Sequence, residues 1–591
     1  MRILSVQALR GANFWSTINT KLIQVRLEID CDVYNDKKSL ALLNKINFLT
    51  IDFQKEIEAT KTTEELFAKI CLCLQSSAHF RVEFFAVKKT IYPTIYNVVF
   101  EYAYEEAGIS AAYAAQKIIQ HLIQKKSLDY ELEINQIKKI ISAVKPNETI
   151  SNLLHQAKQK NIPVLLPSNQ NKLQFGYGKN GLELNNTIDA NSILSLFSEN
   201  REWRIPIIAI TGSNGKTTTT RLIAHIVTLS NAKVGFTTSD GIYVDGKMID
   251  EGDTTGPISA ATVLRNKEVE CAVLETARGG IVRAGLGFDA CDIAVVTNVQ
   301  DDHLGISDIE TLEDLAKVKG VVVNSVKKNG VAILNADNIY TKKLGEQASC
   351  KVSWFSLDKN NSVFKNKKYN GNAFAFINNN KISVQKGEDR IIEIDLADVP
   401  ITFNGTLKFM TENVLAATLA CYNYGIEIGT ILNGLKSFFP SAEQTPGRMN
   451  IIEFKKCKVL IDFAHNIDGF IGIRDFLKSI DSKNKVGIIV GTGDRKDSDV
   501  IELGKISAQM FDHILIHQVK FLRGKTAIEL IDLLVQGINS ENSGTTWERV
   551  ADDVEPLKYA LSKAKEGSFI CALSDVLDKP IELVSEYKKE F

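Results

Sequence analysis

The sequence predicts an α/β protein: a parallel sheet flanked by helices, followed by a second α/β domain and preceded by an α+β domain. Two observations predict this class. From residue 201 onward, short apolar runs rich in β-branched residues alternate with helix-like segments, which is typical of a parallel sheet covered on both faces. One of these runs also ends in a glycine loop that leads directly into a helix-like segment.

The 591 residues fit roughly three or four domains. Residues 1–165 mix strand-like and helical runs and predict an α+β domain. Residues 166–200 are rich in Asn, Gly, Ser and Lys and predict a connector. Residues 201–445 predict the central sheet domain, with a polar β-meander at 350–405 before its last helix. Residues 446–591 repeat the α/β rhythm and predict a C-terminal domain.

Composition limits the classes of partner. The net charge is −1, so we expect no bulk attraction to nucleic acid or to an anionic membrane. No apolar run reaches the roughly 18 residues of a membrane-spanning helix. The nine cysteines form no C-x-x-C pair and predict reduced thiols in a cytoplasmic protein.

The glycine loop is the most informative motif. It follows the apolar run at 207–210 and precedes the helix-like segment RLIAHIVTL. This geometry aims backbone N–H groups and a helix N-terminus at one point, which suits a phosphate. The lysine can reach terminal phosphates and the following threonine can bind Mg²⁺. We therefore expect a nucleotide to bind through Thr211, Gly212, Ser213, Asn214, Gly215, Lys216, Thr217 and Thr218.

Acidic residues follow two later strands. One strand ends in Glu275, and the next ends in Gln300-Asp301-Asp302-His303. A single Glu at a strand end is most often a helix cap or a surface charge. Because α/β folds place ligands at the carboxyl ends of strands, the two groups together favour a site for the Mg²⁺ of a bound nucleotide.

From Ile207 to the C-terminus the sequence resembles the Mur ligase family, and most closely the ligase half of the cyanophycin synthetases. The resemblance rests on the motifs TGSNGKTTTTRLIAHI, TTSDGIYVDGKMI, GDTTGP, LETARGGIVRAGLGFD, VTNVQDDHLG, TLEDLAKVKGVVV, TENVLAATLA, PGRMN, IDFAHN and GTGDRKDSD. The N-terminal part resembles the N-terminal domain of the same synthetases, in ILSVQALRGANFWS and YNVVFEYAYEEAG. The resemblance implies a Mur ligase-like central domain with a P-loop.

Two departures from that family pattern stand out. The synthetases carry an ATP-grasp domain between these two parts, whereas here only a short connector separates LQFGYGKN from the Mur-type strand. Many relatives also carry a metal-binding H-x-x-E-H helix in the N-terminal domain. Its three positions correspond here to Glu65, Ala68 and Lys69, so we expect no hydrolytic metal site and one synthetic activity.

The resemblance implies a mechanism. ATP phosphorylates a substrate carboxylate to an acyl phosphate, and an amine then displaces the phosphate. Mg²⁺ is expected on Thr217 and Glu275 and, at a second site, on His303. The resemblance assigns adenine contact to Asn413 and closure on phosphate and ribose to Arg448 and Asp462. His465 lies beside them as a candidate catalytic residue, and Asp494 and Arg495 are candidates for contact with the incoming amine.

Mur ligases also carry a carbamylated lysine that helps bind the second Mg²⁺, since hard cations prefer oxygen ligands. The helix TLEDLAKVK offers Lys317 and Lys319. Anchoring on Thr311 and Glu313 favours Lys319 as the catalytic lysine. The alternative is an ordinary solvated helix lysine.

The acid substrate is expected to bind at GDTTGP and ARGGIVR. Thr255 lies in the first motif, and Arg278 and Arg283 lie in the second. Arginine binds carboxylates bidentately, although either arginine could instead form a structural ion pair. The resemblance implies an acidic carboxylate such as an aspartyl β-carboxyl, a small acid or a short β-aspartyl peptide, and an amine such as arginine.

Two other functions remain open. The chain could be a degenerate synthetase that binds polymer or regulates a partner, although the intact loop argues against this. It could also be a folylpolyglutamate-type or peptidoglycan-type ligase, against which the N-terminal domain argues. We expect a homo-oligomer, a dimer or a tetramer, with the N-terminal domain as a candidate interface.

Overall fold

In the computed structural model the chain forms two units. Unit 1 comprises Met1–Ile205, Thr254–Glu270 and Thr276–Ala290, and unit 2 comprises Pro206–Asp253, Cys271–Glu275 and Cys291–Phe591. The structure describes residues 1–16, 21–30, 60–78, 82–124, 126, 130–166, 172–184, 190–197, 201–302, 304–491, 493, 495–517, 524–541, 543–551, 555–573, 583–584 and 586–588.

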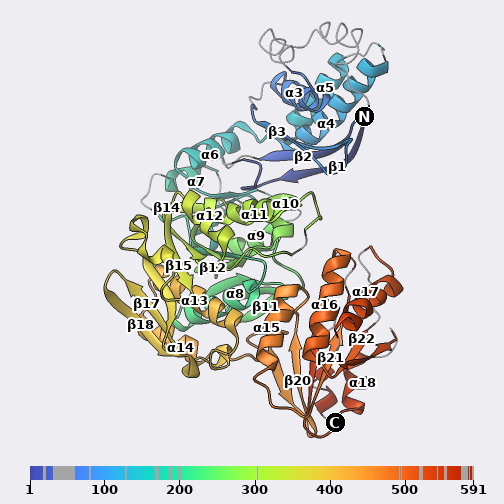
Figure 1. Ribbon diagram of the computed structural model, residues 1–591. Helices are drawn as coiled ribbons and strands as arrows, with labels where there is room; N and C mark the ends of the chain where they lie inside the picture. The colour runs from blue at the N-terminus through green and yellow to red at the C-terminus, as the bar shows by residue number, and fades with distance from the viewer. Residues whose placement is uncertain are drawn as a thin grey trace. The chain divides into compact units, whose positions relative to one another are not determined.

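Unit 1 begins with an antiparallel sheet of order β1-β2-β4-β3. One face packs against helices, because alternate residues of β2 such as Ile23, Val25 and Leu27 are buried in a core shared with α3 and α4. The elements are β1 (Arg2–Leu9), β2 (Leu22–Glu28), α3 (Thr63–Ser76), β3 (Phe85–Lys89), β4 (Ile95–Glu101), α4 (Glu105–Gln124) and α5 (Tyr130–Val144) (Figure 1).

The predicted connector folds in its described part. Phe175, Phe197 and Trp203 share a small apolar core with α6, and three short strands pair in the order β5-β6-β7. The polar composition concealed these few large apolar side chains. The elements are α6 (Glu148–Gln159), β5 (Val164–Leu165), β6 (Gln174–Phe175), the 3₁₀ turn η2 (Gly178–Asn180), β7 (Leu182–Glu183) and α7 (Ala190–Leu196).

Unit 1 also contains two helices whose sequences lie between strands of unit 2. Helix α9 (Pro257–Arg265) begins at Gly256 with a proline in its first turn, a position where the missing N–H costs nothing. Helix α10 (Arg278–Ala284) ends at Gly285, which has a positive φ of 77°. The motif ARGGIVR and the Thr254–Pro257 part of GDTTGP therefore belong to unit 1, while Gly252 and Asp253 belong to unit 2.

Unit 2 holds an eleven-stranded sheet of order β11-β10-β9-β12-β8-β13-β14-β15-β16-β17-β18. Strands β9, β12, β8, β13, β14, β15 and β16 pair in parallel, and β16–β18 form an antiparallel meander. The strands are β8 (Ile207–Thr211), β9 (Val234–Thr237), β10 (Gly241–Val244), β11 (Lys247–Glu251), β12 (Cys271–Glu275), β13 (Cys291–Val296), β14 (Val326–Asn335), β15 (Lys351–Ser356), β16 (Ala373–Asn378), β17 (Lys381–Lys386) and β18 (Asp389–Asp395).

Two groups of helices cover this sheet (Figure 1). Helices α8, α13 and α14 pack together on one face, and α11 and α12 pack together against β8, β13 and β14. The helices are α8 (Lys216–Leu229), α11 (Leu312–Asn324), α12 (Ile339–Gln347), α13 (Lys408–Tyr424) and α14 (Ile428–Lys436), with 3₁₀ turns η3 (Ser362–Lys365), η4 (Lys367–Tyr369), η5 (Leu396–Asp398) and η6 (Pro400–Thr402).

The C-terminal part of unit 2 is a six-stranded sheet of order β19-β20-β24-β21-β22-β23, parallel from β20 to β23. Its elements are β19 (Asn450–Glu453), β20 (Cys457–Asp462), α15 (Ile467–Leu477), β21 (Asn484–Ile489), α16 (Asp497–Met510), β22 (His513–His517), α17 (Ala527–Ser540), β23 (Thr546–Val550), α18 (Pro556–Ser562) and β24 (Ser568–Leu573).

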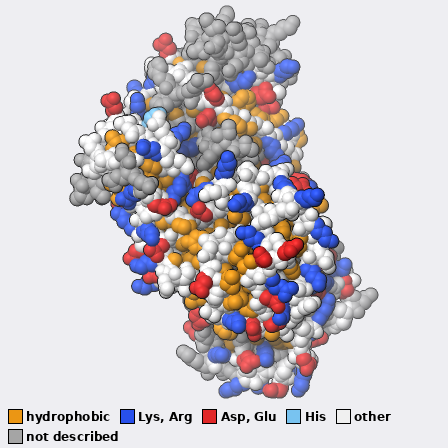
Figure 2. All heavy atoms as spheres, turned by 90° about the vertical axis from the view of Figure 1, so that its left-hand side faces the viewer, with side chains coloured by type: hydrophobic (Ala, Val, Ile, Leu, Met, Phe, Trp, Pro, Cys, Tyr) orange, Lys and Arg blue, Asp and Glu red, His pale blue; other side chains and the backbone are white. Residues whose placement is uncertain are grey.

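These sheets confirm the predicted α/β class, the parallel central sheet and the meander before α13. Strand β8 lies between β12 and β13, and such a central position is where open sheets form a ligand crevice. Acidic and basic side chains are interspersed on the face in Figure 2. Across the described residues, the helices are all too short or too polar to cross a bilayer.

Candidate functional site

The glycine loop connects β8 to α8 as predicted. Gly215 precedes α8 with a φ of 86°, a left-handed conformation that favours glycine. A Cβ at this position would lie 2.1 Å from Oδ1 of Asn413. The backbone therefore turns tightly at the start of α8, with the side chain of α13 directly against it.

The end of β13 holds the loop in shape. The side-chain oxygen of Asn298 accepts hydrogen bonds from the backbone N–H groups of Ser213 and Asn214, at 3.2 and 2.9 Å. The Thr297 hydroxyl donates to the Asn214 carbonyl at 2.6 Å. Because one amide oxygen on a neighbouring strand holds two loop N–H groups, the loop conformation is fixed by the sheet.

Two predicted phosphate and metal ligands lie at the start of α8. The Lys216 ammonium donates to the Ser213 carbonyl at 3.0 Å, so it bends back over the loop. The Thr217 hydroxyl lies 3.1 Å from that of Ser239, which follows β9. The two hydroxyls form a polar pair beside the loop.

Glu275 lies at the end of β12 and is only 3% exposed. Burial raises the pKa of its carboxyl, and Lys216, the Thr217 hydroxyl and Arg448 oppose that shift. Among the described residues no group hydrogen-bonds its Oε2. A buried carboxylate oxygen without a protein partner costs free energy, and a cation ligated there would remove that cost.

Asn413 and Lys319 are both buried, each 3% exposed. Asn413 faces Gly215, while its predicted adenine contact stays a prediction. On α11 Lys319 points inward whereas Lys317 is exposed. This orientation supports the choice of Lys319, and its carbamylation stays a prediction.

Arg448 and Asp462 come from the C-terminal part of unit 2. Arg448 donates to the Ser239 hydroxyl at 3.4 Å and lies over the Phe463 ring at 4.4 Å. Burial raises the pKa of Asp462, opposed by Arg448 and by backbone N–H donors. Those donors are Met449 and Ala464, at 2.9 and 2.8 Å, so Asp462 already fixes the turn that presents Arg448.

Asp302 joins the two sheets of unit 2. Its Oδ1 accepts from Arg495 at 2.9 Å, and both side chains are nearly buried. The His465 Nε2 lies 3.8 Å from the same oxygen, while its Nδ1 lies 2.8 Å from the Phe463 carbonyl. Since a carbonyl only accepts, Nδ1 carries the proton and Nε2 faces Asp302. Arg495, which we expected to contact the amine, is ion-paired in this structure.

A second contact links the loop itself to the C-terminal sheet. Asn466 caps α15, and its amide donates to Oδ1 of Asn214 at 2.9 Å. Asn214 also donates to Gln300 at 3.0 Å. The glycine loop, the end of β13 and the start of α15 thus share one hydrogen-bond network.

The predicted acid-binding residues lie in unit 1. The Ala277 N–H donates to the Thr255 carbonyl at 3.2 Å, and a Cβ on Gly280 would meet that carbonyl at 3.3 Å. The start of α9 and the start of α10 therefore pack closely, with Arg278 and Arg283 on α10.

Some predicted residues cannot be placed. His303 and Asp494 lie outside the described residues. In the N-terminal domain Glu65, Ala68 and Lys69 lie on α3, where Ala68 is fully buried. The described part of the chain contains no group of three His, Cys, Asp or Glu side chains placed to hold a metal.

Sequence reasoning missed Ser239, Asn298 and Asn466 as site residues. Each lies inside a motif that carried the family resemblance, TTSDG, VTNVQ or IDFAHN. Their role depends on contacts across strands, such as Asn466 with Asn214, 252 positions apart. Polar residues that directly follow strand ends were the available signal.

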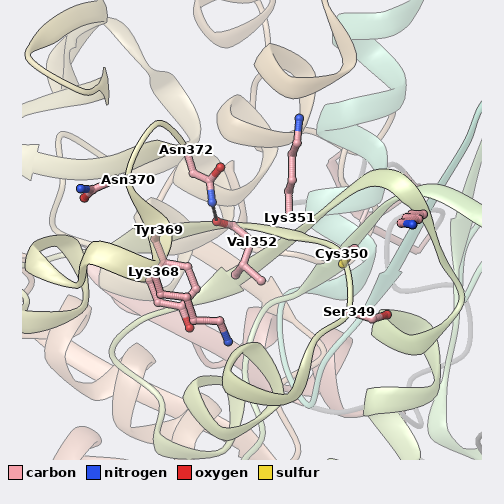
Figure 3. Close-up of a pocket in the computed structure, with 9 residues that line it drawn as sticks. Ser349, Cys350, Lys351, Val352, Lys368, Tyr369, Asn370 and Asn372 are labelled. Atoms are coloured by element: carbon pink, nitrogen blue, oxygen red, sulfur yellow. Dashed lines mark hydrogen bonds between the residues drawn. The ribbon is translucent and has the colours of Figure 1, made fainter.

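A separate cavity of about 340 Å³ lies beside the start of β15 (Figure 3). Lys368 lines it, but its ammonium donates to the carbonyls of Gly345 and Glu346 at 3.4 and 2.8 Å. Asn372 donates to the Val352 carbonyl at 2.8 Å. Strands β8, β14 and β15 run in parallel. The cavity lies at the amino ends of these strands, and the glycine loop lies at their carboxyl ends.

Three family models match the chain. The Mur ligase middle domain matches residues 210–421, and the Mur ligase glutamate ligase domain matches residues 447–575. The cyanophycin synthase-like N-terminal domain matches residues 49–124. Each match falls inside one of the predicted domains.

Among curated relatives, cyanophycin synthetase of Geminocystis herdmanii is 42% identical over 392 residues, 66% of this chain and 45% of the relative. A UDP-N-acetylmuramoyl-L-alanyl-D-glutamate–2,6-diaminopimelate ligase of Caldanaerobacter subterraneus is 27% identical, over 64% of this chain and 74% of the relative. The solved structure of E. coli FolC with DHPP and ADP is 16% identical with a TM-score of 0.48, covering 65% of this chain and 89% of that one. The match thus spans less than half the length of the cyanophycin synthetase, and the chain carries the middle and C-terminal domains of the Mur ligase family with a cyanophycin synthase-like N-terminal domain.

Proposed function

We propose that this chain is an ATP-dependent carboxylate–amine ligase that works through an acyl phosphate. The observation that carries the proposal is Glu275. Its buried oxygen has no hydrogen-bond partner among the described residues, and it lies beside Lys216 and Thr217 at the phosphate loop.

The described residues fit ATP and Mg²⁺. The tight turn at Gly215 and the N–H groups in the first turn of α8 suit phosphate oxygens, and Thr217 and Glu275 offer the oxygen ligands that Mg²⁺ prefers. Mg²⁺ at this position would neutralise charge on the phosphates. Ser239, 3.1 Å from Thr217, is a further oxygen of the same set. His303 and a carbamylated Lys319 complete the proposed second site.

In the proposed reaction a carboxylate oxygen of the acid attacks the γ-phosphorus and ADP leaves. An amine nitrogen then attacks the acyl carbon, and the C–O bond to phosphate breaks. The nitrogen loses its proton, for which Nε2 of His465 is a candidate acceptor. Lys216 and Arg448 stabilise charge on the phosphates, since such transfers depend mainly on positioning and electrostatics.

The proposed substrates are an acidic carboxylate, such as an aspartyl β-carboxyl or a short β-aspartyl peptide, and an amine such as arginine. Arg278 and Arg283 are the proposed carboxylate ligands because guanidinium groups bind carboxylates bidentately. The proposed quaternary state is a homodimer or homotetramer.

Trapping with hydroxylamine tests the proposal without knowledge of the amine. Purified chain, ATP, Mg²⁺ and a panel of acids that includes aspartate and β-aspartyl-arginine should form a hydroxamate, with ADP released. With arginine in place of hydroxylamine, one amide should form per carboxylate, with equal amounts of ADP and phosphate.

Three outcomes would count against the mechanism. AMP and pyrophosphate would indicate adenylate chemistry. No turnover with any acid would favour the degenerate binding protein. Backbone elongation of a cyanophycin primer by the isolated chain would contradict the single synthetic site.

A further inference from the structure

The candidate acid-binding residues Thr255, Arg278 and Arg283 are built into unit 1, although their segments lie between strands of the unit 2 sheet in the sequence. The segments Thr254–Glu270 and Thr276–Ala290 belong to the same compact unit as the N-terminal domain. The contacts that hold these segments in unit 1 indicate a role for the N-terminal domain.

A backbone seam joins the first strand of the chain to α10. The Arg10 N–H donates to the Ala284 carbonyl, and the Leu286 N–H donates to the Ala12 carbonyl, both at 2.9 Å. The Gln7 side chain donates to the Val282 carbonyl at 3.4 Å. These bonds satisfy groups at the end of α10, where helical carbonyls have no partner in their own helix.

The seam is too tight for any residue but glycine at two positions. A Cβ on Gly11 would lie 2.0 Å from the Leu286 carbonyl oxygen. Gly285 has a φ of 77°, and a Cβ there would lie 2.8 Å from the carbonyl oxygens of Gly11 and Ala12. Two segments of the main chain, around Gly11 and around Gly285, therefore pass each other in direct contact. This contact leaves α10 little freedom to shift.

The end of the segment Thr276–Ala290 is held by Tyr177 of the connector and by Arg204, which follows the connector. The Tyr177 hydroxyl donates to Asp289 at 3.0 Å, and Arg204 binds the same carboxylate with two nitrogens, at 2.9 and 2.6 Å. Tyr177 is only 2% exposed. A bidentate pair of this kind fixes both distance and orientation.

The connector also holds α9, which contributes Thr255 through the turn before it. The Gln174 side chain donates to the Leu264 carbonyl at 3.0 Å and is itself buried. Arg265, near the end of α9, donates to the Lys172 carbonyl at 2.8 Å. Helix α9 and the segment that follows α10 are thus anchored to residues that precede β8.

We propose that the N-terminal domain and the connector are the acid-positioning part of the enzyme: the seam between Arg10–Ala12 and Ala284–Leu286 holds α10 so that Arg278 and Arg283 bind the substrate carboxylate. This inference rests on the proposed function. The positioning residues are Gly11, Gly285 and Gln7, which act through α10. An intact seam therefore sets acid affinity, while nucleotide affinity is set by unit 2.

Gly11→Ala is the direct test, with Arg2→Ala, on the exposed part of β1 that leads to Gly11, as the matched control. Hydrogen–deuterium exchange over residues 277–288 should be faster in Gly11→Ala than in wild type, and unchanged in Arg2→Ala. Because Gly11→Ala could unfold the domain, Gln7→Ala provides a milder change that removes the hydrogen bonds to Val282 and Gln24 without a clash. Exchange in 95–101, the central β4, reports global unfolding of the domain.

The functional readout separates the acid from the nucleotide. In the hydroxamate assay, the KM for the acid that wild type activates should rise about tenfold in Gly11→Ala and about threefold in Gln7→Ala. The dissociation constant of AMPPNP should stay within twofold of wild type in both variants.

An unchanged acid KM in a folded Gly11→Ala protein that exchanges faster over 277–288 would overturn the inference. Equal loss of AMPPNP and acid affinity would overturn it as well, since it would indicate a general structural role. Absence of hydroxamate in wild type with every acid would instead overturn the proposed function, whatever the exchange data give.

Discussion

The proposed nucleotide side, in unit 2, and the proposed acid side, in unit 1, are built in different ways. The phosphate loop is local: strand, loop and helix follow one another from Ile207 to Leu229. The acid side depends on contacts between distant residues, such as Gln7 and Val282, 275 positions apart. The proposed nucleotide side is one continuous motif, whereas the motifs of the proposed acid side are held by residues far away in the sequence, which no motif marks.

The largest expected effect on the reaction rate comes from a substitution in the glycine loop of unit 2. Lys216→Ala should lower hydroxamate formation about 10²–10³-fold, or roughly 3–4 kcal/mol, because a preorganised charged contact to phosphate is lost. Acid affinity should be unaffected. Lys247→Ala, in the exposed strand β11 of the same unit, is the control. A folded Lys216→Ala protein with the wild-type rate would refute the assignment of the loop.

Next in size is the ion pair that joins the two sheets of unit 2. Asp302→Asn leaves Arg495, whose side chain is 4% exposed, without a carboxylate. Breaking a buried pair costs roughly 3–5 kcal/mol, so urea unfolding should give a free energy about 3 kcal/mol lower. Asp475→Asn, which breaks an exposed pair with Lys478, should change it by less than about 1 kcal/mol. Equal effects of the two substitutions would contradict the buried pair.

The stability of unit 2 should depend on pH through Glu412. Burial raises its pKa from 4.5 to about 7, with Asp337 and Asp468 adding to the shift and Asn335 and Lys408 opposing it. Between these values the folded protein holds a proton that the unfolded chain has released, so the free energy of unfolding falls as pH rises.

Glu412→Gln should remove that dependence and stabilise the protein at pH 8 by on the order of 2 kcal/mol. Urea unfolding at pH 5, 6.5 and 8 measures it, with exposed Glu313→Gln as the control. A pH profile unchanged by Glu412→Gln would show that this carboxyl titrates normally.

The smallest expected effect isolates the acid side. Arg278→Lys keeps the charge but loses the planar fork that binds carboxylate with two nitrogens. The KM for the acid should rise about tenfold, close to 1.4 kcal/mol, at constant AMPPNP affinity. Arg390→Lys, on the exposed meander of unit 2, is the control. Loss of AMPPNP affinity in Arg278→Lys would contradict the proposal that Arg278 serves the acid and not the nucleotide.

The sequence was sufficient to predict the features that are formed by residues close together in the chain. The loop at Gly215, the parallel sheet and the position of Glu275 at a strand end all followed from periodicity and spacing. It was insufficient for the connector, since a few residues such as Phe175 form a core that average composition conceals. It also could not pair Arg495 with Asp302, because ion pairs between separate sheets depend on how the sheets pack.

The arrangement of segments has a consequence for how such enzymes can diversify. The chain crosses between the units five times, after residues 205, 253, 270, 275 and 290. A single recombination event between genes therefore cannot exchange the acid-side unit as one contiguous block. Under the proposed function, a new acid specificity arises by substitutions in the short segments Thr254–Glu270 and Thr276–Ala290, whereas exchange of the whole unit takes replacement of the coding sequence up to residue 290.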